Sequence, residues 1–246
     1  MKNRAYGSFA FRFRVLIFLL LYLFGFLAPW DRLTPAWGKG TLWLAASTVL
    51  ARSSWIGLAA ATLTVTIVAL GCLAAGAMLR VWGTAFLGSA VMRDAALHGD
   101  QIVAAGPYRY LRNPLYLGSW FLALAVSILM PPSGAPFFLL STSAFLLFLI
   151  SAEEGFLSAT GGDVYRQYLL TVPRLLPRLT SGAAPSPARP QWADALLAEV
   201  FPISFTVCFA VFSWRYNARI LIQCLLVCYG LSLVGRAFAR GETRAR

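Results

Sequence analysis

The sequence carries little charge for its length. Only 12% of its 246 residues are charged, about half the share of a typical soluble domain, whereas 59% are hydrophobic. Four long stretches contain no Asp, Glu, Lys or Arg: residues 15–30, 53–79, 113–152 and 220–235. This composition excludes an ordinary water-soluble globular protein.

Cysteine and histidine are also scarce, which argues against a metal site. All four cysteines, Cys72, Cys208, Cys224 and Cys228, lie in apolar segments, where free cysteine behaves as a small hydrophobic residue. Cys224 and Cys228 share a helix face, but a zinc site needs about four ligands and the single histidine, His98, is remote in sequence. We therefore expect neither a disulfide framework nor a bound metal.

The apolar runs predict membrane-spanning helices, because a helix needs roughly 20 mostly apolar residues to cross a bilayer. The runs do not alternate at period two, which excludes an outer-membrane barrel. The sequence therefore predicts an all-α, polytopic transmembrane protein with about six spans. One span begins at Val15, and the others cover residues 54–79, 114–130, 136–152, 195–213 and 218–238.

The basic residues set the expected orientation. With six spans, 16 of the 21 Lys and Arg residues lie on one side of the membrane, together with both termini. The positive-inside rule predicts that this side is cytoplasmic. Residues 41–51 are apolar but too short to span, so we expect an interfacial or re-entrant segment. An anionic membrane surface explains the net charge of +12 without a nucleic-acid partner. The alanine-rich, basic composition without an organelle signal favours a bacterial inner membrane.

The chain is expected to have four regions. Residues 1–80 form an N-terminal transmembrane region, and residues 81–180 form a core of two spans with cytoplasmic loops. Residues 181–193 contain three prolines among small residues and read as a flexible linker. Residues 194–246 form a C-terminal transmembrane hairpin.

The first polar motif is GPYRYLRNPLYLG at residues 106–118. Asn113 is a favoured N-cap and Pro114 a favoured first helical residue, so a helix should begin here and attract carboxylates or phosphates to its N-terminus. The motif also contains two arginines and three tyrosines: Arg109, Arg112, Tyr108, Tyr110 and Tyr116. Such side chains also occur at ordinary helix ends in the membrane interface, whereas the ordered string favours a site.

The second polar motif is the pair Glu153 and Glu154 at the end of the fourth span. Carboxylates at a helix C-terminus oppose the helix dipole, so another interaction should favour them there. They could accept hydrogen bonds from a ribose diol or an ammonium group. Alternatively, Arg109, Arg112 or Arg166 could neutralise them.

A short amphipathic helix is expected at residues 164–170. Tyr165, Tyr168 and Leu169 have the spacing of one helix face, and the proline-containing stretch from Val172 to Pro177 follows. Such a helix would lie on the membrane, either closing over a site or serving as a plain interfacial anchor.

Taken in order, the 106–118 motif, the glutamate pair and the pattern Y-x-x-Y-x-x-x-V-P-R-x-x-P at 165–177 resemble the isoprenylcysteine carboxyl methyltransferase family and the related phospholipid methyltransferases. The resemblance covers residues 100–177, and residues 79–82 also look like the family. It implies S-adenosylmethionine as cofactor in a cytoplasm-facing pocket. It also implies a lipophilic or lipid-linked acceptor that enters from the bilayer.

The resemblance further implies the residues of the cofactor site. These are Asp100, Gln101, Ile102, Val103, Tyr108, Asn113, Pro114, Leu115, Tyr116 and Glu153. Methyl transfer depends on in-line positioning and a dry site more than on a strong acid or base. As catalytic residues we expect Arg109 or Arg112 to orient a carboxylate acceptor, and Glu154 to act as base for an amine acceptor.

Three departures from the family bear on the substrate. Asn113 replaces the histidine usual in isoprenylcysteine enzymes, as it does in phospholipid methyltransferases. Leu149 stands where an arginine should hold the prenylcysteine carboxylate, and the glycine pair of phospholipid methyltransferases has only Gly83 and Gly88 as candidates. The alternatives are a phospholipid N-methyltransferase, an NADPH-dependent membrane sterol or enone reductase with a similar motif, and a non-enzymatic membrane scaffold.

Overall fold

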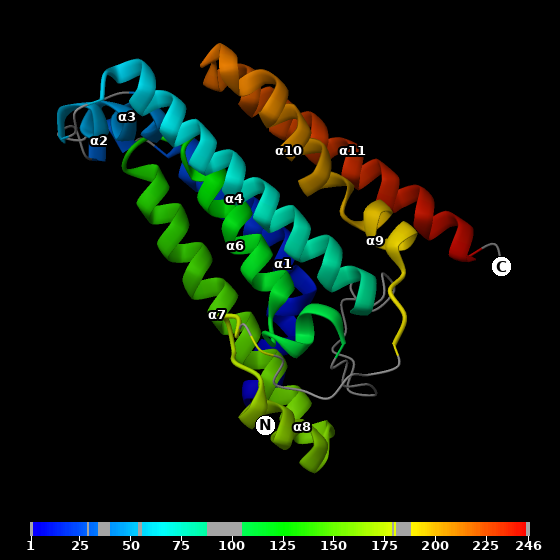
Figure 1. Ribbon diagram of the computed structural model, residues 1–246. Coiled ribbons are helices and arrows are strands. Elements are labelled where there is room, and N and C mark those ends of the chain that lie inside the picture. Colours follow the sequence, from blue (N-terminus) through cyan, green and yellow to red (C-terminus); the bar gives the residue numbers. More distant parts are fainter. Residues whose placement is uncertain are drawn as a thin grey trace.

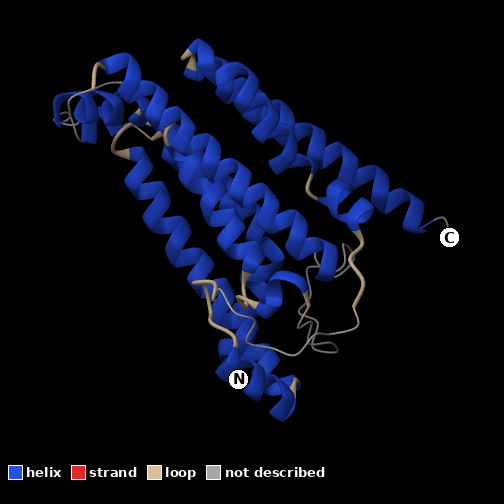
Figure 2. Ribbon diagram, viewed as in Figure 1, coloured by secondary structure: helices blue, strands red, loops and turns tan. Residues whose placement is uncertain are grey.

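The computed structural model describes residues 2–28, 30–33, 40–53, 56–87, 105–178, 180 and 188–244. Within these ranges the chain is helical and contains no strand, as the sequence predicts (Figure 2). The elements are α1 (Lys2–Leu27), α2 (Trp30–Leu33), α3 (Leu42–Ser53), α4 (Leu58–Leu87), η2 (Gly106–Arg109), α6 (Pro114–Ser127), α7 (Gly134–Thr160), α8 (Gly162–Thr171), α9 (Trp192–Ala198), α10 (Val200–Phe212), η3 (Ser213–Arg215) and α11 (Ala218–Arg244).

The long helices run back and forth between two ends of the molecule (Figure 1). At the end that we call the α3 end, the backbone N–H of Leu42 donates to the carbonyl of Met130, and the rings of Trp43 and Tyr216 lie 5.8 Å apart. At the opposite end, which we call the site end, lie η2 and α8 (Figure 1). Helices α1, α4, α6, α7, the α9–α10 pair and α11 alternate in direction (Figure 1).

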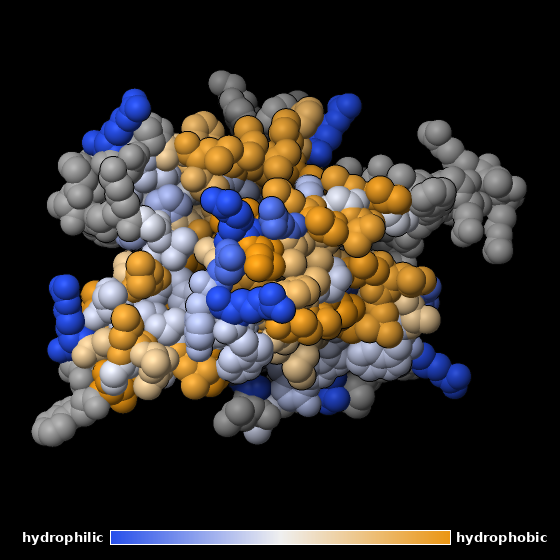
Figure 3. All heavy atoms as spheres, turned by 90° about the horizontal axis from the view of Figure 1, so that it is seen from above, coloured by the Kyte–Doolittle hydropathy of each residue, from blue (hydrophilic) through white to orange (hydrophobic). Residues whose placement is uncertain are grey.

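Apolar helices with outward-facing apolar side chains make this an integral membrane protein. In the described residues three helices are long and apolar enough to cross a membrane, within Leu58–Leu87, Gly134–Thr160 and Ala218–Gly235, and α9 with α10 makes a fourth if the bent pair is one span. Exposed side chains such as Ile67, Leu140 and Leu226 would face lipid, and Figure 3 shows apolar atoms over much of the surface seen from above. The count of six spans stays a prediction.

The segment expected as one continuous span over residues 195–213 is broken. Helices α9 and α10 meet at Glu199 with a bend of 69°. Pro202, in the first turn of α10, has no N–H to donate to the carbonyl of Ala198, and its ring disfavours a helix that continues through this point. Glu199 lies at the break, and its buried carboxylate bonds to Arg80 of α4, as described below.

Helices α4 and α6 approach each other closely because glycines face each other. A Cβ on Gly76 would lie 2.8 Å from the carbonyl oxygen of Gly118, and a Cβ on Gly118 would lie 2.9 Å from that of Gly76. Nearer the site end, a Cβ on Gly83 would lie 2.9 Å from Cδ2 of Leu115. Small residues allow such contact between membrane helices, and here they fix the first turn of α6 against α4.

One buried apolar cluster joins the bundle to its C-terminal helices. Leu73 of α4 and Phe138 of α7 share this cluster with Phe205 and Phe209 of α10 and Leu221 of α11. Helices α10 and α11 therefore share a core with the rest of the protein.

Candidate functional site

The 106–118 motif begins with a tight turn at the site end. Gly106 has a φ of +53°, a conformation that glycine adopts readily, and a Cβ there would overlap the ring of Phe86. The short helix η2 follows and buries the ring of Tyr108. The glycine of the motif thus sets the position of its first tyrosine.

The start of α6 is where the sequence predicts it, but Asn113 uses its side chain differently. Asn113 occupies the N-cap position and Pro114 the first helical position, and the Asn113 side chain makes no capping hydrogen bond. Its amide instead donates to Oε1 of Glu154 at 3.2 Å and to the carbonyl of Arg174 at 3.0 Å. Asn113 therefore joins both polar motifs to the segment after α8.

The two polar motifs meet between α6 and α7. The hydroxyl of Tyr116 donates to Oε2 of Glu153 at 2.8 Å. Arg14, on the first helix, adds positive charge near Glu153. Leu149, one turn earlier on α7, is fully buried in an apolar cluster with Phe11. The carboxylate of Glu153 thus lies at the border between the apolar bundle and the polar site end.

Glu154 has two guanidinium partners. Its Oε1 lies 3.3 Å from Nη1 of Arg112, and its Oε2 lies 3.0 Å from Nε of Arg174. Arg174 also donates to the hydroxyl of Ser151 at 2.7 Å. Arg166, which the sequence offered as a neutralising partner, pairs instead with Asp163 at 3.2 Å. Glu153 therefore accepts a hydrogen bond from a neutral hydroxyl with the charge of Arg14 nearby, whereas Glu154 is paired with two arginines.

Residues 172–178, which we call the strap, fold back over the first motif. The N–H of Arg112 donates to the carbonyl of Pro173 at 2.9 Å, and the N–H of Arg178 donates to that of Tyr110 at 3.1 Å. The hydroxyl of Tyr168 on α8 donates to the carbonyl of Tyr108 at 2.8 Å. These contacts pack α8 and the strap against the first motif, and a role for α8 in closing over a site stays a prediction.

Tyr108 has a buried hydroxyl for which the described residues offer no hydrogen-bond partner. Burial, followed by the negative charge of Glu153, raises the pKa of Tyr108 well above its ordinary value. The group is therefore a protonated donor at neutral pH. An unsatisfied buried donor costs free energy and calls for an explanation, such as a ligand atom.

The expected site residues fall into two groups, and two further residues were not expected. The residues at the site end are Tyr108, Asn113, Pro114, Leu115, Tyr116, Glu153, Glu154, Arg109 and Arg112. Asp100, Gln101, Ile102, Val103 and Gly88 lie outside the described residues. Sequence reasoning gave no role to Arg14 and Arg174, although Arg174 is the arginine of the V-P-R-x-x-P pattern.

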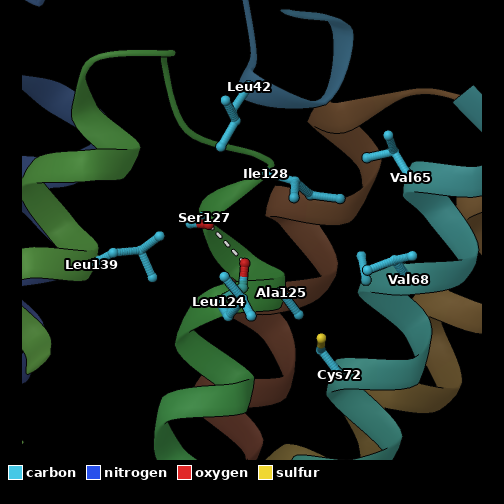
Figure 4. Close-up of a pocket in the computed structure, with 10 residues that line it drawn as sticks. Leu42, Val65, Val68, Cys72, Leu124, Ala125, Ser127, Ile128 and Leu139 are labelled. Atoms are coloured by element: carbon cyan, nitrogen blue, oxygen red, sulfur yellow. Dashed lines mark hydrogen bonds between the residues drawn. The ribbon is translucent and has the colours of Figure 1, made fainter. Parts of the chain in front are cut away.

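An apolar cavity of about 180 Å³ lies between α4 and α6 (Figure 4). It is lined by Leu42, Val65, Val68, Ala69, Cys72, Leu124, Ala125, Ser127, Ile128 and Leu139. Ser127 is the last residue of α6, whereas Tyr116 is in its first turn, so the cavity belongs to the α3 end. The expected cofactor pocket at the site end stays a prediction.

The fold and the site define a class: an integral membrane protein of α-helices, with buried and paired polar groups at one end of the bundle. Within it, residues 64–162 match a family model described as Phospholipid methyltransferase. No curated protein and no solved structure matches the chain. The matched segment contains both polar motifs. It confirms the resemblance to the phospholipid methyltransferases and indicates a membrane methyltransferase.

Proposed function

We propose that the protein is an S-adenosylmethionine-dependent methyltransferase that acts on a lipophilic acceptor reaching it from the bilayer. The hydrogen bond from Tyr116 to Glu153 at 2.8 Å carries the proposal, because it joins the two polar motifs within the segment that matches a methyltransferase family. A carboxylate held by a neutral hydroxyl retains capacity to accept from an ammonium group or a ribose diol.

The residues at the site end fit such a cofactor. Its polar groups would find an acceptor in Glu153 and a buried donor in Tyr108, whose hydroxyl otherwise lacks a partner among the described residues. Asp100, Gln101, Ile102, Val103, Asn113, Pro114, Leu115 and Tyr116 complete the proposed cofactor site. When bound, the cofactor supplies a methyl group on a sulfonium. The protein then has to bind the cofactor and the acceptor, orient them and exclude water from the site.

The arginines and the strap have distinct proposed roles. Arg109 or Arg112 orients an anionic part of the acceptor. Glu154 holds the strap in place through Arg174, and the strap keeps water away from the reacting atoms. If the acceptor is an amine, it must lose a proton, and Glu154 can serve as base only after releasing one of its present partners.

A phospholipid amine is the acceptor class that the observations favour over a prenylcysteine carboxylate. Leu149 occupies the position at which an arginine should hold that carboxylate, and it is packed against Phe11 in an apolar cluster. The family match points the same way. The same match favours a methyltransferase over an NADPH-dependent reductase.

Calorimetric titration of the detergent-purified protein tests the proposal. We expect saturable binding of S-adenosylhomocysteine that is lost in Glu153→Ala and kept in Asp163→Asn, a change at an exposed carboxylate on α8. Binding of NADPH instead would move the protein to the reductases, and binding of neither would favour a scaffold. Transfer of radiolabelled methyl to phosphatidylethanolamine vesicles, compared with N-acetyl-S-farnesylcysteine, then identifies the acceptor class.

A further inference from the structure

A second polar cluster lies between α4 and the break that separates α9 from α10. Arg80 donates from Nε to Oε2 of Glu199 at 2.7 Å and from Nη2 to Oε1 at 2.9 Å. The hydroxyl of Thr84 donates to the same Oε1 at 2.9 Å. The side chain of Glu199 is only 1% exposed. This is a buried, two-point ion pair outside the site described above.

The same guanidinium reaches α6 on its other side. Nη1 of Arg80 donates to the hydroxyl of Ser119 at 2.7 Å and, at 3.4 Å, to the carbonyl of Leu115. Leu115 precedes Tyr116, the residue that holds Glu153. A continuous chain of polar contacts thus runs from the C-terminal helices, through Arg80, to the first turn of α6.

Stability alone is a weak reason for this cluster. The desolvation of a buried ion pair often cancels its attraction, and apolar replacements of similar size can be as stable or more so. What an arginine fork adds is fixed geometry. The segment before α9 is also docked on α4, where the N–H of Gln191 donates to the carbonyl of Ala85 at 2.7 Å.

We propose that Glu199 is a positioning residue: acting through Arg80, it fixes the first turn of α6 and so the Tyr116–Glu153 pair. Helices α9 to α11 lie outside the family match at residues 64–162, and in this assignment they complete the site. The ligand-binding consequence rests on the proposed function. The effect on α6 does not.

Three variants of the full-length protein in detergent test this. Glu199→Gln removes one charge, the double variant Arg80→Met with Glu199→Leu replaces the pair by apolar side chains, and Asp194→Asn is the control at an exposed carboxylate on α9. Each is measured for Tm, for S-adenosylhomocysteine affinity well below Tm, and for amide hydrogen exchange over residues 114–122.

We expect Glu199→Gln to lower Tm, to weaken affinity about tenfold or more and to speed exchange, because loss of a group that orients a binding residue typically costs about 10- to 100-fold in affinity. The double variant should recover Tm but not affinity. If the pair were merely structural, the affinity would recover together with Tm. Recovery of both, or unchanged affinity and exchange in Glu199→Gln, would overturn the proposal. If the wild type does not bind S-adenosylhomocysteine, the proposed function fails, and the exchange data still decide whether Glu199 positions α6.

Discussion

Glu153 and Glu199 are two carboxylates in an apolar bundle, and they differ in the partner each one has. Glu199 is fully buried and held by the two-point fork of Arg80. Glu153 is partly buried and accepts a hydrogen bond from the neutral hydroxyl of Tyr116, with the positive charge of Arg14 nearby. A guanidinium fork satisfies both charge and geometry, whereas one hydroxyl leaves acceptor capacity. Glu199 is thus fixed between two helices, whereas the function proposed above assigns Glu153 to a ligand.

The largest effect should come from breaking the framework pair. Arg80→Met leaves the carboxylate of Glu199 buried without its charge partner, and such a change costs about 3–5 kcal/mol of stability. Thermal unfolding in detergent should therefore show a large fall in Tm. Arg166→Met is the matched control, because its ion pair with Asp163 is exposed and should contribute little. Equal falls in both variants would contradict the framework role of Glu199.

The reciprocal change at Glu153 should affect binding more than stability. Glu153→Gln keeps the size of the side chain and an oxygen for Tyr116 but removes the charge that a cationic ligand group would meet. Losing a hydrogen bond to a charged group costs roughly 1.5–3 kcal/mol, so the Kd for S-adenosylhomocysteine should rise about 10-fold to 150-fold. Calorimetry measures this, with Tm as the internal check. A collapse of Tm with unchanged affinity would reverse the roles of the two carboxylates.

A substitution at Gly106 tests Tyr108, on which the charges of both carboxylates act. The charges of Glu153 and Glu199 both act on Tyr108, which the Gly106 turn holds in place. Gly106→Ala forces a side chain into the left-handed region and against the ring of Phe86, so we expect a loss of about 1–2 kcal/mol and weaker binding.

Gly71→Ala is the control for that change. Gly71 lies in α4, and a Cβ there would meet no atom within 4 Å. Alanine is the better helix former, so this variant should keep or raise Tm. If both glycine variants bind S-adenosylhomocysteine like the wild type, the turn at Gly106 has no part in the site.

The sequence predicted contacts within the motifs better than contacts between distant segments. Asn113 and Pro114 begin a helix as helix-capping preferences indicate, and the glutamate pair meets that helix as the ordered motifs suggest. The side chain of Asn113 departs from its expected capping role, because a carboxylate and a carbonyl from other segments offer it partners. Local propensity could not include those partners.

The framework pair was missed for a related reason. Glu199 is the one carboxylate in an expected span, and a charge at such a depth is a signal in itself. Its partner Arg80 lies 119 residues earlier, and only the packing of α9 across α4 brings them together. The break in the span coincides with Pro202, a local signal that the prediction of one continuous span over residues 195–213 did not use.

The smallest effect, and the one of unusual sign, is expected at Tyr108. Its buried hydroxyl lacks a partner among the described residues, so Tyr108→Phe should raise the free energy of unfolding by about 1 kcal/mol while weakening S-adenosylhomocysteine binding. The raised pKa gives this gain a pH dependence. Below the ordinary tyrosine pKa of 10.0 the folded and unfolded states both keep the proton. Above it the unfolded state releases the proton first, so the wild type loses stability that the phenylalanine variant keeps. Thermal unfolding measured on both sides of pH 10 should show that the difference in stability between Tyr108→Phe and the wild type widens as the pH rises. If the variant is instead destabilised at neutral pH, protein groups already satisfy the hydroxyl.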